Sequence, residues 1–212
     1  GVMAWPTASD TYGGRIIGTI GSDMRAGIDY EHNRKDAEQN MVMSGSNKFL
    51  TYLWPGVETE KLGIFFEKNL GNISYGLRYD QVELDPTKAA EDAGGMMFKT
   101  ANEVYSTDYD VTIVATKREY DNISGFLRFT KDIDPGETYI NLSVNERAPD
   151  TTELFHAKWN ASSEMMRHVG NPNLSSERHM TIEVGYEGML MGNHITGSVY
   201  YNDVDDYITT HR

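Results

Sequence analysis

The sequence contains no cysteine among its 212 residues, which excludes disulfide bonds, thiolate zinc sites and cysteine nucleophiles. Basic residues are scarce as well, because 19 Lys and Arg stand against 32 Asp and Glu and the net charge is −13. A nucleic-acid partner needs a basic surface, so this balance argues against that class of function. No run of eighteen apolar residues occurs, which excludes a transmembrane helix.

Sequence motifs of the common enzyme classes are also missing. The chain has no Gly-x-Ser-x-Gly nucleophile elbow, no phosphate-binding loop and no metal triad, and its six His residues are scattered. A small enzyme on a β scaffold is therefore the weakest of three interpretations, and we expect no catalytic residues. The other two are a membrane β-barrel and a soluble β-sandwich binding module.

The dominant pattern in the sequence is strict alternation of apolar and polar residues, which predicts β-strands. The apolar positions include Ala26, Ile28 and Tyr30, then Tyr75, Leu77 and Tyr79, then Met180, Ile182, Val184 and Tyr186. The opposite positions carry full charges and glycines. Both a sandwich and a barrel alternate in this way, but a charged second face suits a barrel with lipid outside and a wet lumen inside.

The lengths of the connections favour the barrel. Short turns rich in Gly, Pro and Asn are predicted at 69–72, 134–137 and 189–193, and long polar stretches at 36–59, 86–120 and 148–176. Outer-membrane barrels alternate short periplasmic turns with long extracellular loops. The segment 109–116 also resembles a strand, and we assign it to a long loop, as a hairpin above the membrane. About eight strands result. An open sheet of this kind has two unpaired edges, which lipid does not tolerate, so the sheet either closes as a small barrel or belongs to a larger one.

Four motifs, in order along 60–210, resemble the TonB-dependent outer-membrane receptor family. The first is Leu62-Gly63-Ile64-Phe65-Phe66-Glu67 with Tyr75-Gly76-Leu77-Arg78-Tyr79-Asp80, and the second is Asn145-Glu146-Arg147-Ala148-Pro149-Asp150 with Glu153-Leu154-Phe155. The third is Gly170-Asn171-Pro172-Asn173-Leu174 with Glu177 and Glu183-Val184-Gly185-Tyr186, and the fourth is Val199-Tyr200-Tyr201-Asn202-Asp203-Val204-Asp205-Asp206-Tyr207-Ile208. The resemblance implies an all-β fold, an antiparallel transmembrane β-barrel segment of about eight strands with long extracellular loops.

The resemblance also implies a function and a setting. Such receptors take up a scarce nutrient across the outer membrane of Gram-negative bacteria, energised by the TonB complex acting on a plug region. We expect 1–212 to be a partial barrel domain, with the plug domain and the C-terminal barrel strands outside it. The expected partners are outer-membrane lipid and, through the missing plug region, the TonB complex.

A finer resemblance, to the copper-receptor branch, rests on Ser124–Phe129, Glu146–Asp150 and Met166–Pro172. It implies copper as the transported substrate rather than a resident cofactor. Soft thioether and imidazole ligands suit copper, so we name candidate ligands in the predicted external loops: Met165, Met166, His168, Met41 and Met43. The alternatives are that these Met residues fill gaps in packing, and that the receptor takes a siderophore or another metal chelate.

A second candidate set consists of charged residues on the polar positions of the strands. We expect these to face the lumen and the plug: Asp29, Glu67, Arg78, Asp80 and Glu183. The simpler interpretation is a barrel interior held together by salt bridges or solvated by water.

Overall fold

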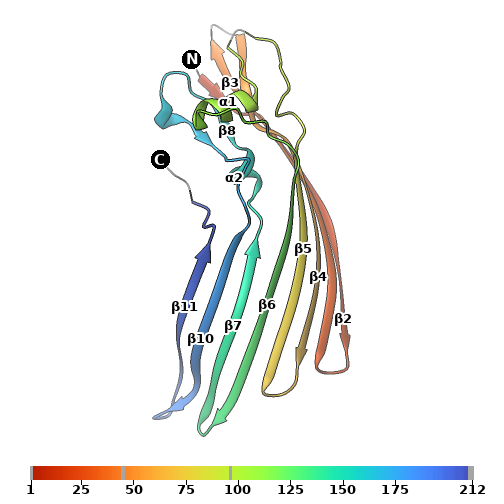
Figure 1. The fold of residues 1–212 in the computed structure, drawn as a ribbon, viewed down its shortest axis with the longest axis vertical. Helices are drawn as coiled ribbons and strands as arrows, with labels where there is room; N and C mark the ends of the chain where they lie inside the picture. The colour runs from red at the N-terminus through yellow and green to blue at the C-terminus, as the bar shows by residue number, and fades with distance from the viewer. Residues whose placement is uncertain (1, 44–45, 96, 210–212) are drawn as a thin grey trace.

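The computed structural model describes residues 2–43, 46–95 and 97–209, and it forms one large antiparallel sheet (Figure 1). The strands of this sheet are β1 (Val2–Ala4), β2 (Thr7–Ile20), β3 (Met24–Met43), β4 (Ser46–Asn69), β5 (Ile73–Pro86), β6 (Arg118–Ile133), β7 (Gly136–Arg147), β10 (Glu177–Leu190) and β11 (Asn193–Asp205). Eight of them are long, as predicted. Each pairs with its neighbours in sequence, and β1 adds three residues to the end of β3.

Apart from 36–59, the connections lie as the loop lengths predicted. The turns at 21–23, 70–72, 134–135 and 191–192 are at one end of the sheet, and the long connections 87–117 and 148–176 are at the other (Figure 1). Glycines with positive φ shape three of the short turns, at Gly21 (66°), Gly71 (75°) and Gly192 (80°), because a residue without Cβ adopts this conformation without strain. The turn at Gly21 joins β2 to β3 and adds a fourth hairpin of the same kind.

One face of the sheet is formed by apolar side chains, and we call it the apolar face. Within the described residues no other layer covers it. The register places Ile16, Ile28, Ile64, Tyr79 and Ile123 in one row across five strands. Their exposed fractions run from 36% for Tyr79 to 74% for Ile16. A sandwich would bury this row against a second sheet. Within the described residues the row is exposed instead, which fits a wall that faces lipid.

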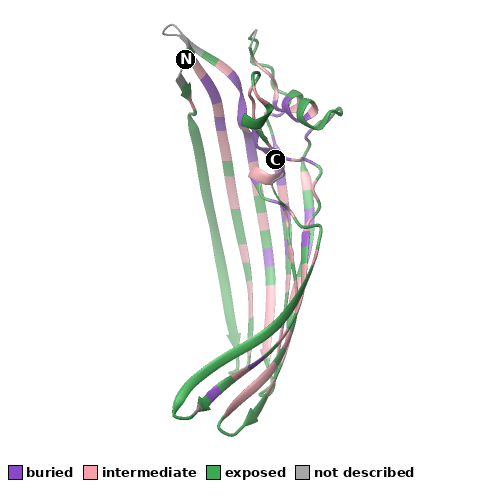
Figure 2. Ribbon diagram, turned by 90° about the vertical axis from the view of Figure 1, so that its left-hand side faces the viewer, coloured by how far each residue is buried: buried purple, intermediate pink, exposed green. Residues whose placement is uncertain are grey.

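The opposite face, the polar face, changes character along its length. Towards the short turns it carries charges, in the row Arg15, Asp29, Gly63, Asp80 and Asn122. Towards the long connections it becomes apolar and buried, and Figure 2 shows the buried segments gathered at that end. The buried core there joins the sheet to the loops through Val57, Val82, Leu84, Ala89, Ala101, Val104, Tyr105, Ile113, Ala115, Tyr120, Leu154, Phe155 and Ala157.

The loops that cover this core are themselves ordered. We call the described residues of 87–117 and 148–176 the loop layer. It contains α1 (Ala101–Tyr109), α2 (Thr151–Phe155), a 3-10 turn η1 (Glu164–Met166) and the short strands β8 (Ala157–Lys158) and β9 (His168–Val169), which pair with each other. None of the helices in the described chain is both long enough and apolar enough to cross a membrane.

Two predictions about this end were wrong. The stretch 36–59 is not a loop, because β3 and β4 continue through it as a paired hairpin with irregular register between Lys35 and Asn40. These shifts break the alternation that identifies a strand. The segment 109–116 is not a hairpin either: it is the end of α1, a left-handed residue at Asp110 (φ 51°) and extended coil. Its assignment to a long loop was correct.

Candidate functional site

The polar face carries a charge cluster centred on Arg78. Its guanidinium donates two hydrogen bonds to Asp29, at 3.0 and 2.9 Å, and two to Asp80, at 2.7 and 2.6 Å. Asp29 is on β3 and Arg78 on β5, so the side chain must cross over β4. It crosses at Gly63, where a Cβ would overlap the guanidinium group. Lys61 adds a second cation, 3.7 Å from Asp80.

The other two charged residues predicted for this face lie on it but apart from the cluster. Glu67 pairs with Arg25 at 2.9 Å, and Glu183 accepts a hydrogen bond of 3.0 Å from the hydroxyl of Tyr139. Asp29, Arg78 and Asp80 are therefore one unit, while Glu67 and Glu183 each have their own partner. An open basin of about 590 Å³ lies between them, lined by Arg15, Arg25, Phe65, Ser124, Phe126 and Asn141 among others.

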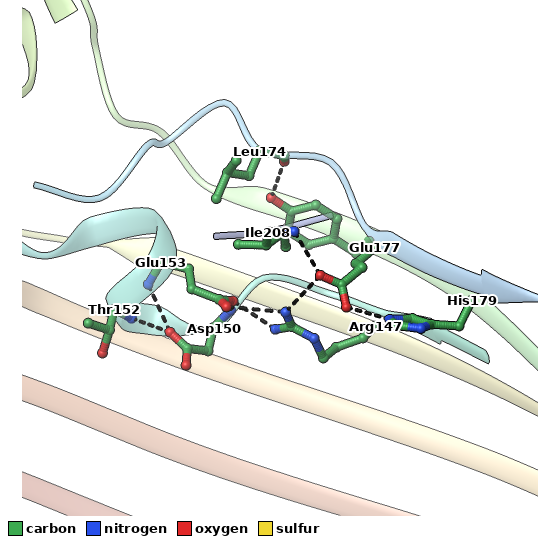
Figure 3. Close-up of polar contacts among 9 residues, drawn as sticks. Arg147, Asp150, Thr152, Glu153, Leu174, Glu177, His179 and Ile208 are labelled. Carbon is green, nitrogen blue, oxygen red and sulfur yellow. Dashed lines mark hydrogen bonds and ion pairs between the residues drawn. The ribbon is translucent and has the colours of Figure 1, made fainter. Parts of the chain in front are cut away.

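At the rim of the sheet, Arg147 connects the wall to the loop layer (Figure 3). It closes β7 and donates to both oxygens of Glu153 in α2, at 2.8 and 3.2 Å. It also contacts Glu177, the first residue of β10, at 3.4 Å. Glu177 is only 5% exposed and accepts the backbone N–H of Ile208 at 2.7 Å. We call Arg147, Glu153 and Glu177 the rim anchor.

We expect Arg147→Ala to loosen α2 while leaving the sheet intact. The change frees Glu153 and leaves the buried Glu177 with His179 and the backbone of Ile208 as partners. Because half of the Arg147 side chain is exposed, the loss is about 1 kcal/mol of local stability. Deuterium exchange of 151–156 should rise roughly fivefold. Arg34→Ala, which removes an exposed pair with Glu58 at 3.5 Å, is the matched control. Equal exchange in both variants would show that the anchor does not hold α2.

Both helices of the loop layer start at capping boxes, which the sequence already contains. Thr100 accepts from the backbone of Glu103, whose side chain binds back to Thr100 N–H. Asp150 and Glu153 repeat this arrangement at α2. Each box satisfies two backbone donors that a helix start leaves free. The spacing Thr-x-x-Glu and Asp-x-x-Glu was therefore the overlooked signal for these helices.

The predicted soft ligands are spread over two parts of the molecule. Met41 lies in β3, where its register partner is Met3 of β1. Met43 is also in β3, but its side chain lies outside the described residues. The other three lie in the loop layer. Met165 is 97% exposed and Met166 60% exposed.

His168, in β9, lies against a second histidine that the sequence analysis did not single out. The Nδ1 atoms of His168 and His156 are 3.0 Å apart, and His156 Nδ1 is 2.7 Å from the carbonyl oxygen of His168. Burial lowers the pKa of His156 to about 4, so its imidazole is neutral at ordinary pH. The two residues are twelve positions apart in sequence with no metal-ligand spacing, so only the β8–β9 pairing reveals them as neighbours. In the described chain, no group of three or more His, Cys, Asp or Glu side chains is placed to hold a metal.

The comparisons with known proteins agree with this geometry. A family model described as TonB dependent receptor-like, beta-barrel matches residues 4–212. A solved structure titled "Copper transporter OprC" is similar with a TM-score of 0.68 and 19% identity, over 97% of this chain and 31% of that one. A double mutant of the Serratia marcescens hemophore receptor HasR, in complex with its hemophore HasA and heme, is similar with a TM-score of 0.51 and 20% identity, over 97% of this chain and 34% of that one. No curated protein sequence matches.

The two structural neighbours show the fold, and the chain spans about a third of the length of each. The family model covers nearly the whole chain and accounts for the alternating strands, the short turns at one end and the loop layer at the other. Proteins of this family are transporters. The chain belongs to the TonB-dependent receptor family and forms part of its antiparallel transmembrane β-barrel.

Proposed function

We propose that this chain is part of the wall and the extracellular mouth of an outer-membrane receptor for energised uptake of copper. The observation that carries the proposal is the grouping of exposed Met166 and His168 in the loop layer, at the end of the barrel opposite the short turns. Thioether and imidazole groups are ligands that copper favours, Cu(I) especially. The similarity to a structure titled as a copper transporter supports the same substrate.

The wall and the mouth have separate tasks in this proposal. The apolar face contacts the lipid of the Gram-negative outer membrane, and the loop layer is extracellular. The polar face lines the lumen, where the Arg78 cluster, Glu67 and Glu183 face the plug. The plug and the remaining strands lie in the rest of the receptor, through which the TonB complex acts.

Copper accumulation in cells tests the substrate. We expect a Gram-negative host that expresses the full receptor under copper limitation to accumulate several times more copper than the same host without it. Mass spectrometry of washed cells measures the metal content. Deleting TonB should abolish the gain. Equal copper content with and without the receptor would contradict the proposal.

The second candidate is a metal chelate, because the HasR neighbour is titled in complex with heme. The same host then provides the discriminating experiment. Growth on heme or a ferric siderophore as the only iron source, dependent on the receptor and without any gain in copper, would favour the chelate.

A further inference from the structure

We propose that His156, His168 and Met166 form a binding site for a soft monovalent metal ion in the loop layer, with Cu(I) as the natural ligand. The proposal rests on the proposed function only for the choice of copper. The geometry of the site stands on the loop layer itself. It adds His156 to the candidate ligands and removes Met165 and Met41 from them.

The first argument is the approach of the two imidazoles. Their Nδ1 atoms are 3.0 Å apart and their ring centroids 4.7 Å apart. For a metal ion about 2.0 Å from each nitrogen, the nitrogen–metal–nitrogen angle would be roughly 100°, close to the tetrahedral value. An ion therefore fits between the rings with little movement. Two nitrogens that are already 3.0 Å apart need little reorganisation on binding.

The second argument is that the metal-free pair is held together by one proton. A carbonyl oxygen can only accept, so His156 Nδ1 carries the hydrogen that it donates to His168 O at 2.7 Å. The same hydrogen lies toward His168 Nδ1. An ion that binds both nitrogens replaces this proton, which moves to Nε2 of His156 and leaves the ring neutral. Trp54 fixes the ring from the other side, with centroids 5.2 Å apart and an edge-on angle of 62°.

The third argument concerns Met166, which ends η1 two residues before His168. The side chain of Met166 is 60% exposed, and His168 is exposed as well. The Arg167 side chain is turned inward, 11% exposed, with its guanidinium 4.4 Å from the ring of Trp159. Met166 and His168 therefore both lie at the surface of the loop layer, on either side of the inward-turned Arg167 in the sequence.

The position and charge of this short segment are fixed by its neighbours. Asn160 Nδ2 contacts Met166 Sδ at 3.5 Å, and the carbonyl of Asn160 accepts from Arg167 Nε at 3.1 Å. The charge of Arg167 is offset by Asp108 and Glu164, at 3.9 and 3.8 Å. Two imidazoles and one thioether without a carboxylate ligand suit Cu(I) better than the hard cations Ca²⁺ or Mg²⁺.

The test uses the purified full-length receptor and titrates it with Cu(I) against a chromophoric Cu(I) chelator, without oxygen. We expect one Cu(I) in the loop layer and at least tenfold weaker binding after His156→Asn or His168→Ala. Asparagine keeps the hydrogen bond to His168 O through Nδ2 and removes the metal-binding nitrogen, so His156→Asn separates ligation from folding. Met165→Ala and His194→Ala, at an exposed residue beside a short turn, should change the affinity less than twofold.

X-ray absorption at the copper edge gives an independent readout. We expect nitrogen and sulfur neighbours in the wild type and loss of the sulfur after Met166→Ala. Unchanged affinity in His156→Asn and His168→Ala would overturn the site. If those variants lose Cu(I) but the wild-type receptor raises no copper in cells, the site stands and the uptake proposal fails. If cells accumulate copper equally with wild type and with both His variants, uptake stands and this site is wrong.

Discussion

Replacing Gly63 with valine should destabilise the barrel wall by about 3 kcal/mol, because it removes the space through which Arg78 reaches Asp29. The guanidinium would have to leave Asp29, Asp80 or both. Asp29 and Asp80 have side chains only 16% and 11% exposed, so the loss leaves charges with little water. The midpoint of denaturant unfolding in detergent, followed by tryptophan fluorescence, measures the effect.

Two controls make this experiment decisive. Gly14→Val places the same side chain on another strand, where nothing lies within 4 Å of the new Cβ, and should change the midpoint little. In the second control, Arg78→Ala is combined with Gly63→Val. Gly63 leaves room for the Arg78 side chain, so its replacement matters less once Arg78 is gone. The double variant should therefore lose clearly less stability than the sum of the two single losses. Additive losses would mean that Gly63 has another role.

Phe155→Ala should detach the loop layer from the wall. Phe155 is fully buried in the core that joins α2 to the sheet, and its carbonyl accepts the hydroxyl of the buried Tyr105 at 2.8 Å. Removing a buried phenylalanine costs about 3–5 kcal/mol, which exceeds the expected effect of Arg147→Ala. Limited proteolysis should then cut within 87–117 and 148–176 at least a hundred times faster than in the wild type.

The sheet itself should survive this change, since the cost falls on the loop layer. Resistance of the barrel to unfolding by detergent and heat should stay near the wild-type value. Val114→Ala, at a side chain 65% exposed in the same layer, is the control and should not alter the cleavage rate. Collapse of the whole barrel in Phe155→Ala would contradict the expectation that the sheet is stable without the packed loop layer.

The sequence predicted the wall well because each strand is long and one of its faces has a single environment. Ile28, Tyr79, Val184 and Val199 all emerged as members of the exposed apolar face. Three of the four short turns were also predicted, since Gly, Asn and Pro mark them. The charges on the opposite positions lie together on the other face for the same reason, because alternate residues point to opposite sides. That this face lines the lumen stays a prediction.

The end of the barrel with the loops was predicted less well, because its order comes from tertiary packing. Beyond Lys35 the register shifts destroy the alternation in β3 and β4. The polar residues Gln39 and Thr51 are buried there, at 1% and 0% exposed, and Gln39 forms hydrogen bonds with both backbone groups of Trp159. No local pattern predicts a partner 120 residues away.

The candidate ligands show the same division. Met166 and His168 could be named as candidate ligands from their side-chain types and their predicted loop, and their role stays a prediction. His156 was not named, because only the fold of the loop layer brings it to His168. The Arg78 cluster is intermediate. Its three charges could be assigned to one face, but the crossing over Gly63 required the register of β3, β4 and β5.

The rim anchor has a mechanical consequence for the mouth of the receptor. Glu177 binds Arg147, which holds α2, and also the backbone of Ile208, which follows β11. Two connections that are far apart in the chain are therefore fastened at one carboxylate. A change at Glu177 therefore acts on both connections at once, because one carboxylate contacts the arginine that holds α2 and the backbone that follows β11.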